Sequence, residues 1–280
     1  MQLKRFADND SIIFTNKDGL VYLQFTNLKK YDNAIIHCFT TRLGGVSKDS
    51  CFSLNLGDKF YDSIKNVEEN FERICRAIGI KKDSLVFSNQ VHGTNIRKVG
   101  EKDKNKKIED RRKTEPHDGL MTNVRGISLV TFYADCVPVL FYDHNKKVIA
   151  MAHSGWRGTV SEIAAETVKK LAEEYHCDPD NLEVAIGPSI GKCCFEVGED
   201  VYFQFLDRLH WSEAYCRKTG EKKWHIDLQG IVRQSLINTG VRRENICTAN
   251  ICTKCNKDIF YSHRGDNGKT GSLAAIMKII

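Results

Sequence analysis

Cys136 and His153 are the two residues whose types and positions best suit chemistry at one site. They stand at the ends of two apolar segments, 137–143 and 148–153, which flank a turn-like stretch at 144–145. If these segments form an antiparallel hairpin centred on that stretch, Cys136 pairs with His153, whereas an odd loop would shift the pairing by one residue. Opposed residues in such a ladder have Cβ atoms about 5 Å apart, close enough to share a metal ion or form a thiolate–imidazole pair.

His92 is a third candidate, because it ends a strand-like segment and precedes Gly93, which permits close approach of the backbone. The stretch Ser154–Gly158 follows His153 and leads toward a predicted helix. Its free N–H groups and the guanidinium of Arg157 suit an anion such as phosphate. Each of these residues alone is more often structural than functional, so it is their combination that favours a site.

The other cysteines are interpreted as structural. Cys252 and Cys255 have the spacing of half a zinc site or of a redox pair, but no second C-x-x-C or paired histidine motif completes it. The adjacent Cys193 and Cys194 are too strained for a disulfide and are expected to pack against a sheet. Six more are predicted to be reduced and structural: Cys38, Cys51, Cys75, Cys177, Cys216 and Cys247.

Composition limits the class of protein. With 280 residues, 41% hydrophobic and 28% charged, the chain is long enough to bury a core, which excludes a disordered or fibrous protein. It has no apolar run long enough to span a bilayer, no signal peptide and an odd number of cysteines, 11, which predicts a reduced, cytoplasmic protein without membrane association. The net charge of +6 is spread along the chain, so nucleic-acid binding is not expected.

The pattern of apolar residues predicts an α+β fold, with a single domain over residues 1–280 and a mixed β-sheet flanked by helices. Short strands and helices follow one another without regular βαβ alternation. Helices are predicted over 67–80, 199–209 and 227–239. A further helix is predicted to start near Thr159, where Thr159 and Glu162 would form a capping box. Strands are expected in these segments: 11–14, 20–25, 34–41, 84–93, 127–135, 137–143, 147–153, 182–188, 246–252 and 258–263, and an apolar segment over 273–280 closes the chain.

The segment at about 101–113 is the most polar part of the chain. Eleven of its 13 residues are charged, so it is predicted to be an exposed, mobile loop rather than a polyanion-binding arm.

Nine short motifs resemble, in order, those of the YlmD/YfiH family, which carries the name multicopper polyphenol oxidase (laccase domain) and is now regarded as a family of purine nucleoside phosphorylases. The resemblance covers roughly residues 35–280. The matching stretches are Phe39–Ser47, Ser53–Gly57, Asn89–Gly93, Asp118–Thr122, Ala134–Pro138, Ala152–Gly158, Ile186–Gly191, Cys252–Thr253 and Phe260–Arg264.

The resemblance implies a cytoplasmic enzyme with one zinc held by His92, Cys136 and His153. It implies phosphorolysis of adenosine, inosine and S-methyl-5′-thioadenosine to a free base and ribose 1-phosphate, together with adenosine deamination. Its motifs place Arg42, Asn55 and the Ser154–Gly158 turn, including Arg157, at the substrate pocket. They also match Arg264, a candidate for binding phosphate or sugar. The partners are then nucleosides and phosphate, and the protein is expected to be a monomer or weak dimer.

Three positions depart from the family pattern. Gly265, Ser272 and Phe71 stand where many members have arginine, which leaves fewer guanidinium groups for phosphate or sugar. Asp135 is the candidate general acid, from its position beside Cys136. It is predicted to act with Cys136 and His153 in catalysis.

Other functions remain open from the sequence. Cys136 and His153 without metal would suit a hydrolase or deamidase. A non-catalytic binding module is a further alternative, in which the missing arginines have silenced the chemistry. Copper would bind the three ligands more tightly than zinc, but nine histidines without an H-x-H pair argue against a multicopper polyphenol oxidase.

Overall fold

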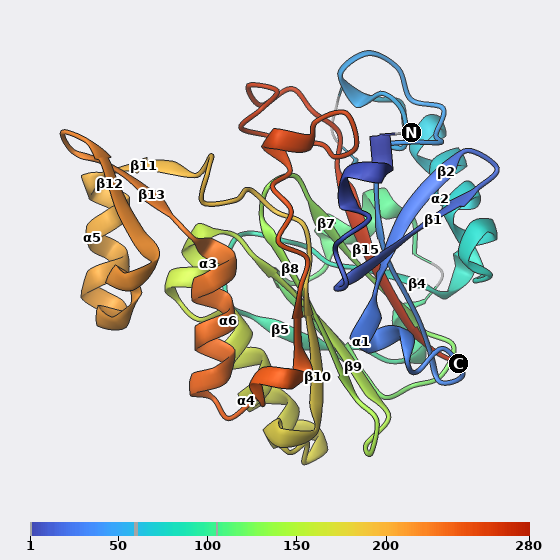
Figure 1. The fold of residues 1–280 in the computed structure, drawn as a ribbon. Helices are drawn as coiled ribbons and strands as arrows, with labels where there is room; N and C mark the ends of the chain where they lie inside the picture. Colours follow the sequence, from blue (N-terminus) through green and yellow to red (C-terminus); the bar gives the residue numbers. More distant parts are fainter. Residues whose placement is uncertain (1, 59–60, 105) are drawn as a thin grey trace.

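The computed structural model describes residues 2–58, 61–104 and 106–280. Within these residues the chain forms two six-stranded sheets and one small three-stranded sheet (Figure 1). The first sheet has the spatial order β1 (Ile12–Lys17), β2 (Leu20–Phe25), β3 (Ile35–Thr40), β15 (Leu273–Ile279), β7 (Ser128–Tyr133) and β4 (Leu85–Phe87). All its neighbouring strands are antiparallel except β4 and β7.

The second sheet carries the longest buried strands. Its order is β14 (Ile246–Thr248), β10 (Leu182–Ile186), β8 (Val137–Asp143), β9 (Val148–Ser154), β6 (Gly119–Thr122) and β5 (Ile96–Lys98). The outer pairs β10–β14 and β5–β6 are parallel and the rest antiparallel. The small sheet contains β11 (Glu196–Gly198), β13 (Lys223–Ile226) and β12 (Cys216–Gly220).

The α-helices are α1 (Thr26–Lys29), α2 (Ile64–Ile78), α3 (Trp156–Val160), α4 (Ile163–Tyr175), α5 (Glu199–Arg208) and α6 (Leu228–Asn238). Short 3₁₀ helices connect them: η1 (Gln2–Phe6), η2 (Asp49–Cys51), η3 (Lys82–Ser84), η4 (Glu101–Asp103), η5 (Ile108–Lys113), η6 (Pro179–Asn181), η7 (His210–Tyr215), η8 (Arg243–Asn245) and η9 (Lys254–Asn256). Among the described residues, no helix combines the length and apolar character that a membrane span requires.

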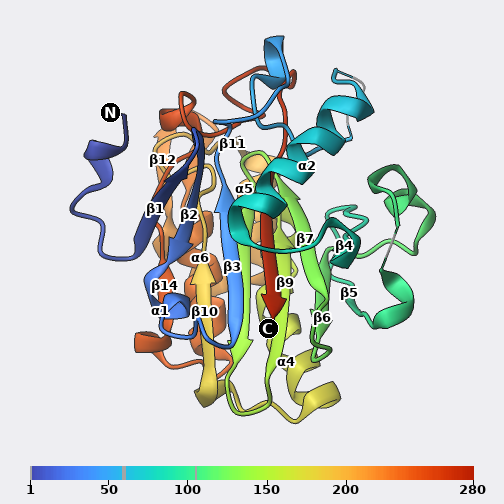
Figure 2. The same ribbon diagram turned by 90° about the vertical axis from the view of Figure 1, so that its right-hand side faces the viewer.

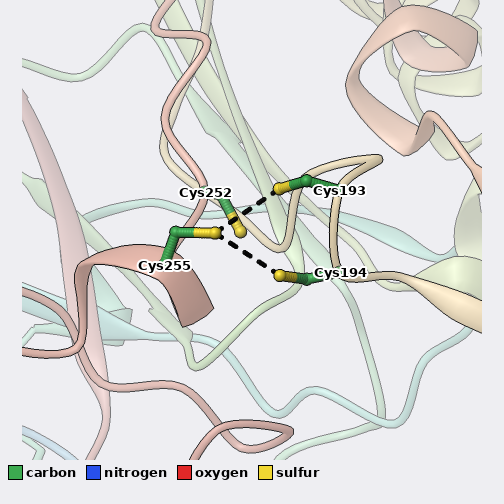
Figure 3. A group of neighbouring side chains, drawn as sticks. All are labelled: Cys193, Cys194, Cys252 and Cys255. Carbon is green, nitrogen blue, oxygen red and sulfur yellow. Dashed lines mark hydrogen bonds between the residues drawn. The ribbon is translucent and has the colours of Figure 1, made fainter.

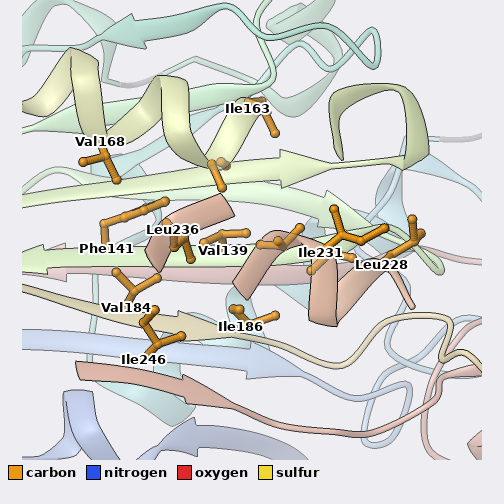
Figure 4. Packing of buried hydrophobic residues seen from close by; sticks show 14 of the residues in the cluster. Val139, Phe141, Ile163, Val168, Val184, Ile186, Leu228, Ile231, Leu236 and Ile246 are labelled. Atoms are coloured by element: carbon orange, nitrogen blue, oxygen red, sulfur yellow. The ribbon is translucent and has the colours of Figure 1, made fainter. Parts of the chain in front are cut away.

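The core is layered as helix, sheet, sheet and helices (Figures 1 and 2). Leu129 of β7 and Leu140 of β8 belong to one buried cluster that fills the space between the two large sheets. The outer face of the first sheet packs against Phe71 and its neighbours on α2. The outer face of the second sheet packs against α4 and α6, where Phe141 meets Leu236 and related side chains (Figure 4). Both large sheets therefore bury both faces.

The predicted fold class is confirmed, but the single mixed sheet is replaced by two. The apolar segments before and after Cys136 are predicted to belong to the same mixed sheet. Instead β7 belongs to the first sheet and β8 to the second, so residues 134–136 cross between the sheets. Strands that are apolar on both faces do not reveal which sheet they join, because the alternation of polar and apolar residues is missing.

The hairpin register also differs from the prediction. In β8 and β9, Pro138 pairs with His153 and Val137 with Ser154, because the loop is residues 144–147 and its centre lies one residue later than expected. Cys136 is therefore diagonal to His153 rather than opposite. A shift of two positions preserves the face of the strand, since side chains alternate with a period of two.

The boundaries of several elements follow the sequence. Helix α2 ends at Gly79, whose φ of 73° is in the left-handed region that glycine favours, and the side chain of Asp227 caps α6 by accepting a hydrogen bond from the Gly230 amide at 3.0 Å. The predicted capping box at Thr159 and Glu162 is wrong. The Thr159 hydroxyl donates to the Gly155 carbonyl, and the Glu162 carboxylate accepts from the Ser235 hydroxyl.

The strand predicted over 258–263 is also wrong. Ile259 and Phe260 are buried, but their amides bond back to the Asn256 carbonyl in a turn, so this apolar run packs into the core without joining a sheet. The segment predicted over 84–93 is strand only at β4.

The charged segment at 101–113 is folded onto the protein at several points. It contains η4 and η5, and most of its described residues are exposed or partly exposed as predicted, but Asp103 and Ile108 are buried. The carboxylate of Asp103 accepts a hydrogen bond from Arg97 at 2.5 Å and another from the Gly100 amide at 2.9 Å. A pattern of charge alone does not show which members find partners inside the fold.

We predict that Asp103→Ala accelerates tryptic cleavage within 101–113 about tenfold or more. Loss of a charged hydrogen-bond acceptor costs about 1.5–3 kcal/mol and favours local opening. Glu109→Ala is the matched control, because Glu109 is an exposed acidic residue of the same segment. Mass spectrometry of the tryptic fragments measures the cleavage rates. Equal rates for the two variants would show that the segment is mobile, as the sequence predicts.

Candidate metal centre

His92, Cys136 and His153 converge at one point. One ligand atom from each lies within 4.8 Å of the others, and the Cys136 sulfur is 3.8 Å from Nε2 of His92. His153 is buried and His92 is exposed, so the group lies between the core and the surface. The structure therefore brings together the three residues that spacing and motif order had selected.

Three different parts of the fold supply these side chains. Cys136 lies on the crossing between β7 and β8, His153 near the end of β9, and His92 in the loop after β4, with a left-handed φ of 64°. Gly155 fits closely against the group, since a Cβ there would lie 2.7 Å from the His92 ring and 3.2 Å from the Cys136 sulfur. This contact explains why the turn after His153 begins with glycine.

The carboxylate of Asp118 joins two of these parts. One of its oxygens accepts the hydrogen bond of His153 Nδ1 at 2.8 Å and of the His92 amide at 2.9 Å. The other oxygen accepts from the amides of Val91 and Gly93 at 3.0 and 2.7 Å. Asp118 is fully buried, and these four donors compensate its charge.

This arrangement fixes how His153 presents its ring. With Nδ1–H donated to Asp118, Nε2 is the nitrogen that faces Cys136 and that could bind a metal, an arrangement typical of metal-binding histidines. Burial raises the pKa of Asp118, but the hydrogen bond from His153 more than compensates and holds this pKa below its usual value. The sequence analysis placed Asp118 in a motif but assigned it no role, since nothing local in the sequence identifies the partner of a buried carboxylate.

Electrostatics favour a thiolate at this point. Burial alone would raise the pKa of Cys136, but the neighbouring His153 and His92 lower it to about 6. The pKa of His153 shifts the opposite way: burial lowers it, but Cys136 and Asp118 raise it to about 9. The thiolate is the form of cysteine that binds metals and attacks electrophiles.

A pocket of about 770 Å³ opens beside the three ligands. Of the other predicted site residues, Asp135, Arg157 and Arg264 line it. The aromatic side chains Phe132, Tyr133, Trp156 and Phe195 also form its walls.

Asp135 lies in the pocket wall with both carboxylate oxygens engaged. One accepts from the hydroxyl of Thr253 at 2.6 Å and the other from the Arg264 amide at 2.7 Å. Its predicted role as general acid stays a prediction, and these contacts favour instead a role in positioning Arg264.

Arg42, Asn55 and Ser154 are not among the described residues that line the pocket. The Arg42 guanidinium donates to the carbonyls of Phe52 and Lys257, the Asn55 amide is buried in a loop, and the Ser154 hydroxyl bonds Thr159. Their predicted contact with substrate stays a prediction that this arrangement does not favour.

Arg111 and Arg112 also line the pocket, although they belong to the charged segment and no motif in the sequence marks them as site residues. Both donate to Asp58, with nitrogen–oxygen distances from 2.6 to 3.3 Å. Burial raises the pKa of Asp58, but hydrogen bonds from both arginines more than compensate and lower it. Two arginines with one carboxylate leave net positive charge at the pocket.

The donor set fits a transition metal. One thiolate and two imidazoles suit zinc or copper, and three protein ligands beside an open pocket are typical of a catalytic site. The metal-free alternative uses the same Cys136–His153 contact, so geometry alone admits both chemistries.

The family described as multi-copper polyphenol oxidoreductase laccase matches residues 36–280. The chain belongs to this family. Purine nucleoside phosphorylase YlmD of Bacillus subtilis is 31% identical over 264 residues, covering 94% of this chain and 95% of YlmD. A protein named adenosine deaminase RL5, from an unknown prokaryotic organism, is 31% identical over 232 residues, covering 82% of this chain and 88% of RL5.

The fold agrees with this membership. The crystal structure of YlmD from Geobacillus stearothermophilus superposes with a TM-score of 0.87 at 32% identity, covering 96% of this chain and 99% of that one. The relatives named as purine nucleoside phosphorylases and as an adenosine deaminase support an enzyme that processes nucleosides.

We predict that Asp118→Asn weakens binding of a transition-metal ion about 10- to 100-fold, because the amide NH₂ cannot accept every hydrogen bond that the carboxylate accepts. Metal affinity is measured by competition with a chromophoric chelator. Asp143→Asn is the control, since Asp143 is equally buried and accepts two backbone hydrogen bonds at the end of β8. An unchanged affinity in Asp118→Asn would show that the carboxylate does not orient the ligands.

Proposed function

We propose that this chain is a zinc-dependent purine nucleoside phosphorylase. Its substrates are adenosine, inosine and S-methyl-5′-thioadenosine, which phosphate converts to a free base and a ribose 1-phosphate, and it also deaminates adenosine. The observation that carries the proposal is the His92–Cys136–His153 group opening onto a pocket that contains both arginines and aromatic rings. The names of the relatives support the same reaction.

Different residues of the pocket would bind the metal and the phosphate. Zinc bound by the three ligands would supply a Lewis acid and lower the pKa of bound water. Arg112 donates two of its five N–H groups to Asp58, so three remain for an anion. Arg157 and Arg264 also line the pocket and offer further N–H donors to phosphate.

Aromatic side chains suit the base. Arg157 lies over the Trp156 ring at 4.2 Å and Arg264 over the Phe195 ring at 5.7 Å, which holds both guanidinium groups against apolar surfaces. A purine placed against Trp156 or Phe195 would bury its faces while phosphate occupies the arginine side. In phosphorolysis a phosphate oxygen forms the bond to C1′ as the C1′–N9 bond breaks, and the departing base takes a proton.

Incubation with inosine, with and without phosphate, tests the phosphorylase. We expect phosphate-dependent release of hypoxanthine that a chelator abolishes and added zinc restores. Activity that survives complete metal removal would support the metal-free Cys136–His153 enzyme instead. Oxidation of phenols by the copper-loaded protein without nucleoside turnover would support the polyphenol oxidase, and no turnover at high protein concentration would support a binding module.

Deamination is tested separately with adenosine in phosphate-free buffer. We expect conversion to inosine, since this reaction uses water rather than phosphate. Release of adenine alone, only after phosphate is added, would remove the deaminase from the proposal and leave the phosphorylase.

We predict that His92→Ala loses the bound metal at this site and at least 100-fold of the activity while the protein stays folded, because His92 is an exposed loop residue. Metal content, circular dichroism and hypoxanthine release are the measurements. His210→Ala is the matched control, an exposed histidine outside the described pocket lining. A fully active, metal-loaded His92→Ala variant would show that the third ligand is a different residue.

We predict that Arg112→Ala raises the KM for phosphate about 10- to 100-fold, since a hydrogen bond to a charged group is worth about 1.5–3 kcal/mol. Initial rates are measured at varied phosphate with saturating inosine. Arg125→Ala, an exposed arginine that does not line the described pocket, is the control. An equal KM in both variants would place the phosphate elsewhere.

A further inference from the structure

Four cysteines form a second cluster, separate from the group of His92. Cys193 and Cys194 come from the turn before β11, and Cys252 and Cys255 from the segment around η9, some 60 residues later in the chain. Their four sulfurs lie within 4.8 Å of one another and point toward one another (Figure 3). Neither pair completes a metal site alone, so the sequence predicts a structural role for each pair.

The distances suit one metal ion. The Cys255 sulfur lies 3.5 Å from that of Cys193 and 3.4 Å from that of Cys194. Four sulfurs about 2.3 Å from a tetrahedral zinc ion are separated by roughly 3.8 Å. A disulfide needs a sulfur–sulfur distance of about 2.05 Å, and all four cysteines are free thiols.

The backbone packs closely around the cluster. The backbones of Gly191 and Cys255 hydrogen-bond the Cys252 sulfur. Gly191 leaves room for the sulfurs, since a Cβ there would lie 3.0 Å from Cys252 Cβ and 3.4 Å from the Cys193 sulfur. Lys192 and Lys254 directly precede two of the cysteines and bring positive charge near a zinc tetrathiolate, whose net charge is about −2.

We propose that Cys193, Cys194, Cys252 and Cys255 bind a structural zinc ion. Four thiolates complete a tetrahedral shell and leave no position for substrate, in contrast to the three-ligand group in the pocket. Zinc here cross-links the 191–195 turn to the 252–256 segment. The proposal does not rest on the proposed enzymatic activity, because its evidence is the geometry of the cysteines.

The cross-linked segments form part of the pocket wall. Phe195 follows Cys194 and lines the pocket, and Thr253 follows Cys252 and donates its hydroxyl to Asp135. Main-chain hydrogen bonds already join the residues next to these segments, from the Ser189 amide to the Ile251 carbonyl and from the Thr253 amide to the Ser189 carbonyl. A metal at the cysteines therefore holds in place the side of the pocket that carries Arg264, without touching the substrate.

Metal content of the full chain tests the proposal. Protein purified under reducing conditions and saturated with zinc should hold two zinc ions per chain after gel filtration. Cys255→Ser and His92→Ala should each hold one, because each removes a ligand from a different group. Cys247→Ser is the control and should hold two, since Cys247 is a partly buried cysteine outside both groups, 3.0 Å from the Ser11 carbonyl oxygen. Two zinc ions in Cys255→Ser, or none in His92→Ala, would overturn the proposal.

Cobalt supplies a measurement that needs no variant of the cysteine cluster. Cobalt-loaded His92→Ala should show the intense visible absorption and sulfur-to-metal charge transfer of a tetrahedral tetrathiolate site. Cobalt bound there with octahedral spectra would overturn the proposal. Iron with acid-labile sulfide would also overturn the proposal, because it indicates an iron–sulfur cluster. So would a protein mass that is lower by two hydrogens for each disulfide bond in the reduced preparation.

Discussion

The site depends on one buried carboxylate. Asp118 is removed from solvent, and its charge is compensated only because His153 and the backbone of residues 91–93 donate to it. Those donors belong to β9 and to the loop after β4, so the same interaction that makes the buried charge tolerable also sets the positions of two ligands. His92 is then held in a left-handed conformation that the rest of its loop must accommodate.

The third ligand comes from the place where the chain passes between the two large sheets. Residues 134–136 leave β7 and enter β8, and Asp135 has a positive φ of 87° in this crossing. Its carboxylate then accepts hydrogen bonds from Thr253 and Arg264, so one short segment delivers a thiolate and also positions a pocket arginine. Metal ligands and anion donors thus share a single backbone framework.

The tertiary structure decides which charged residues reach the pocket and which cysteines lie together. The charged segment at 101–113 contributes Arg111 and Arg112 to the pocket through their contacts with Asp58, so part of the net positive charge faces the pocket. The cysteines divide into one ligand of the pocket group, four that converge beside the pocket wall, and others that are packed elsewhere. A group of three ligand side chains suits a catalytic metal ion, and a group of four cysteines suits a metal ion that cross-links two segments.

The sequence by itself determined the fold class, helices such as α2 and α6, and the trio of His92, Cys136 and His153, because periodicity, caps and motif order are local. Even the wrong hairpin register kept Cys136 and His153 on one face, since an error of two residues preserves side-chain alternation. Only the tertiary structure decided how the strands divide between sheets, what Asp118 contacts, and which charged residues reach the pocket. It alone joined the two cysteine pairs, because the C-x-x-C spacing of Cys252 and Cys255 does not identify a partner that lies some 60 residues away in the chain.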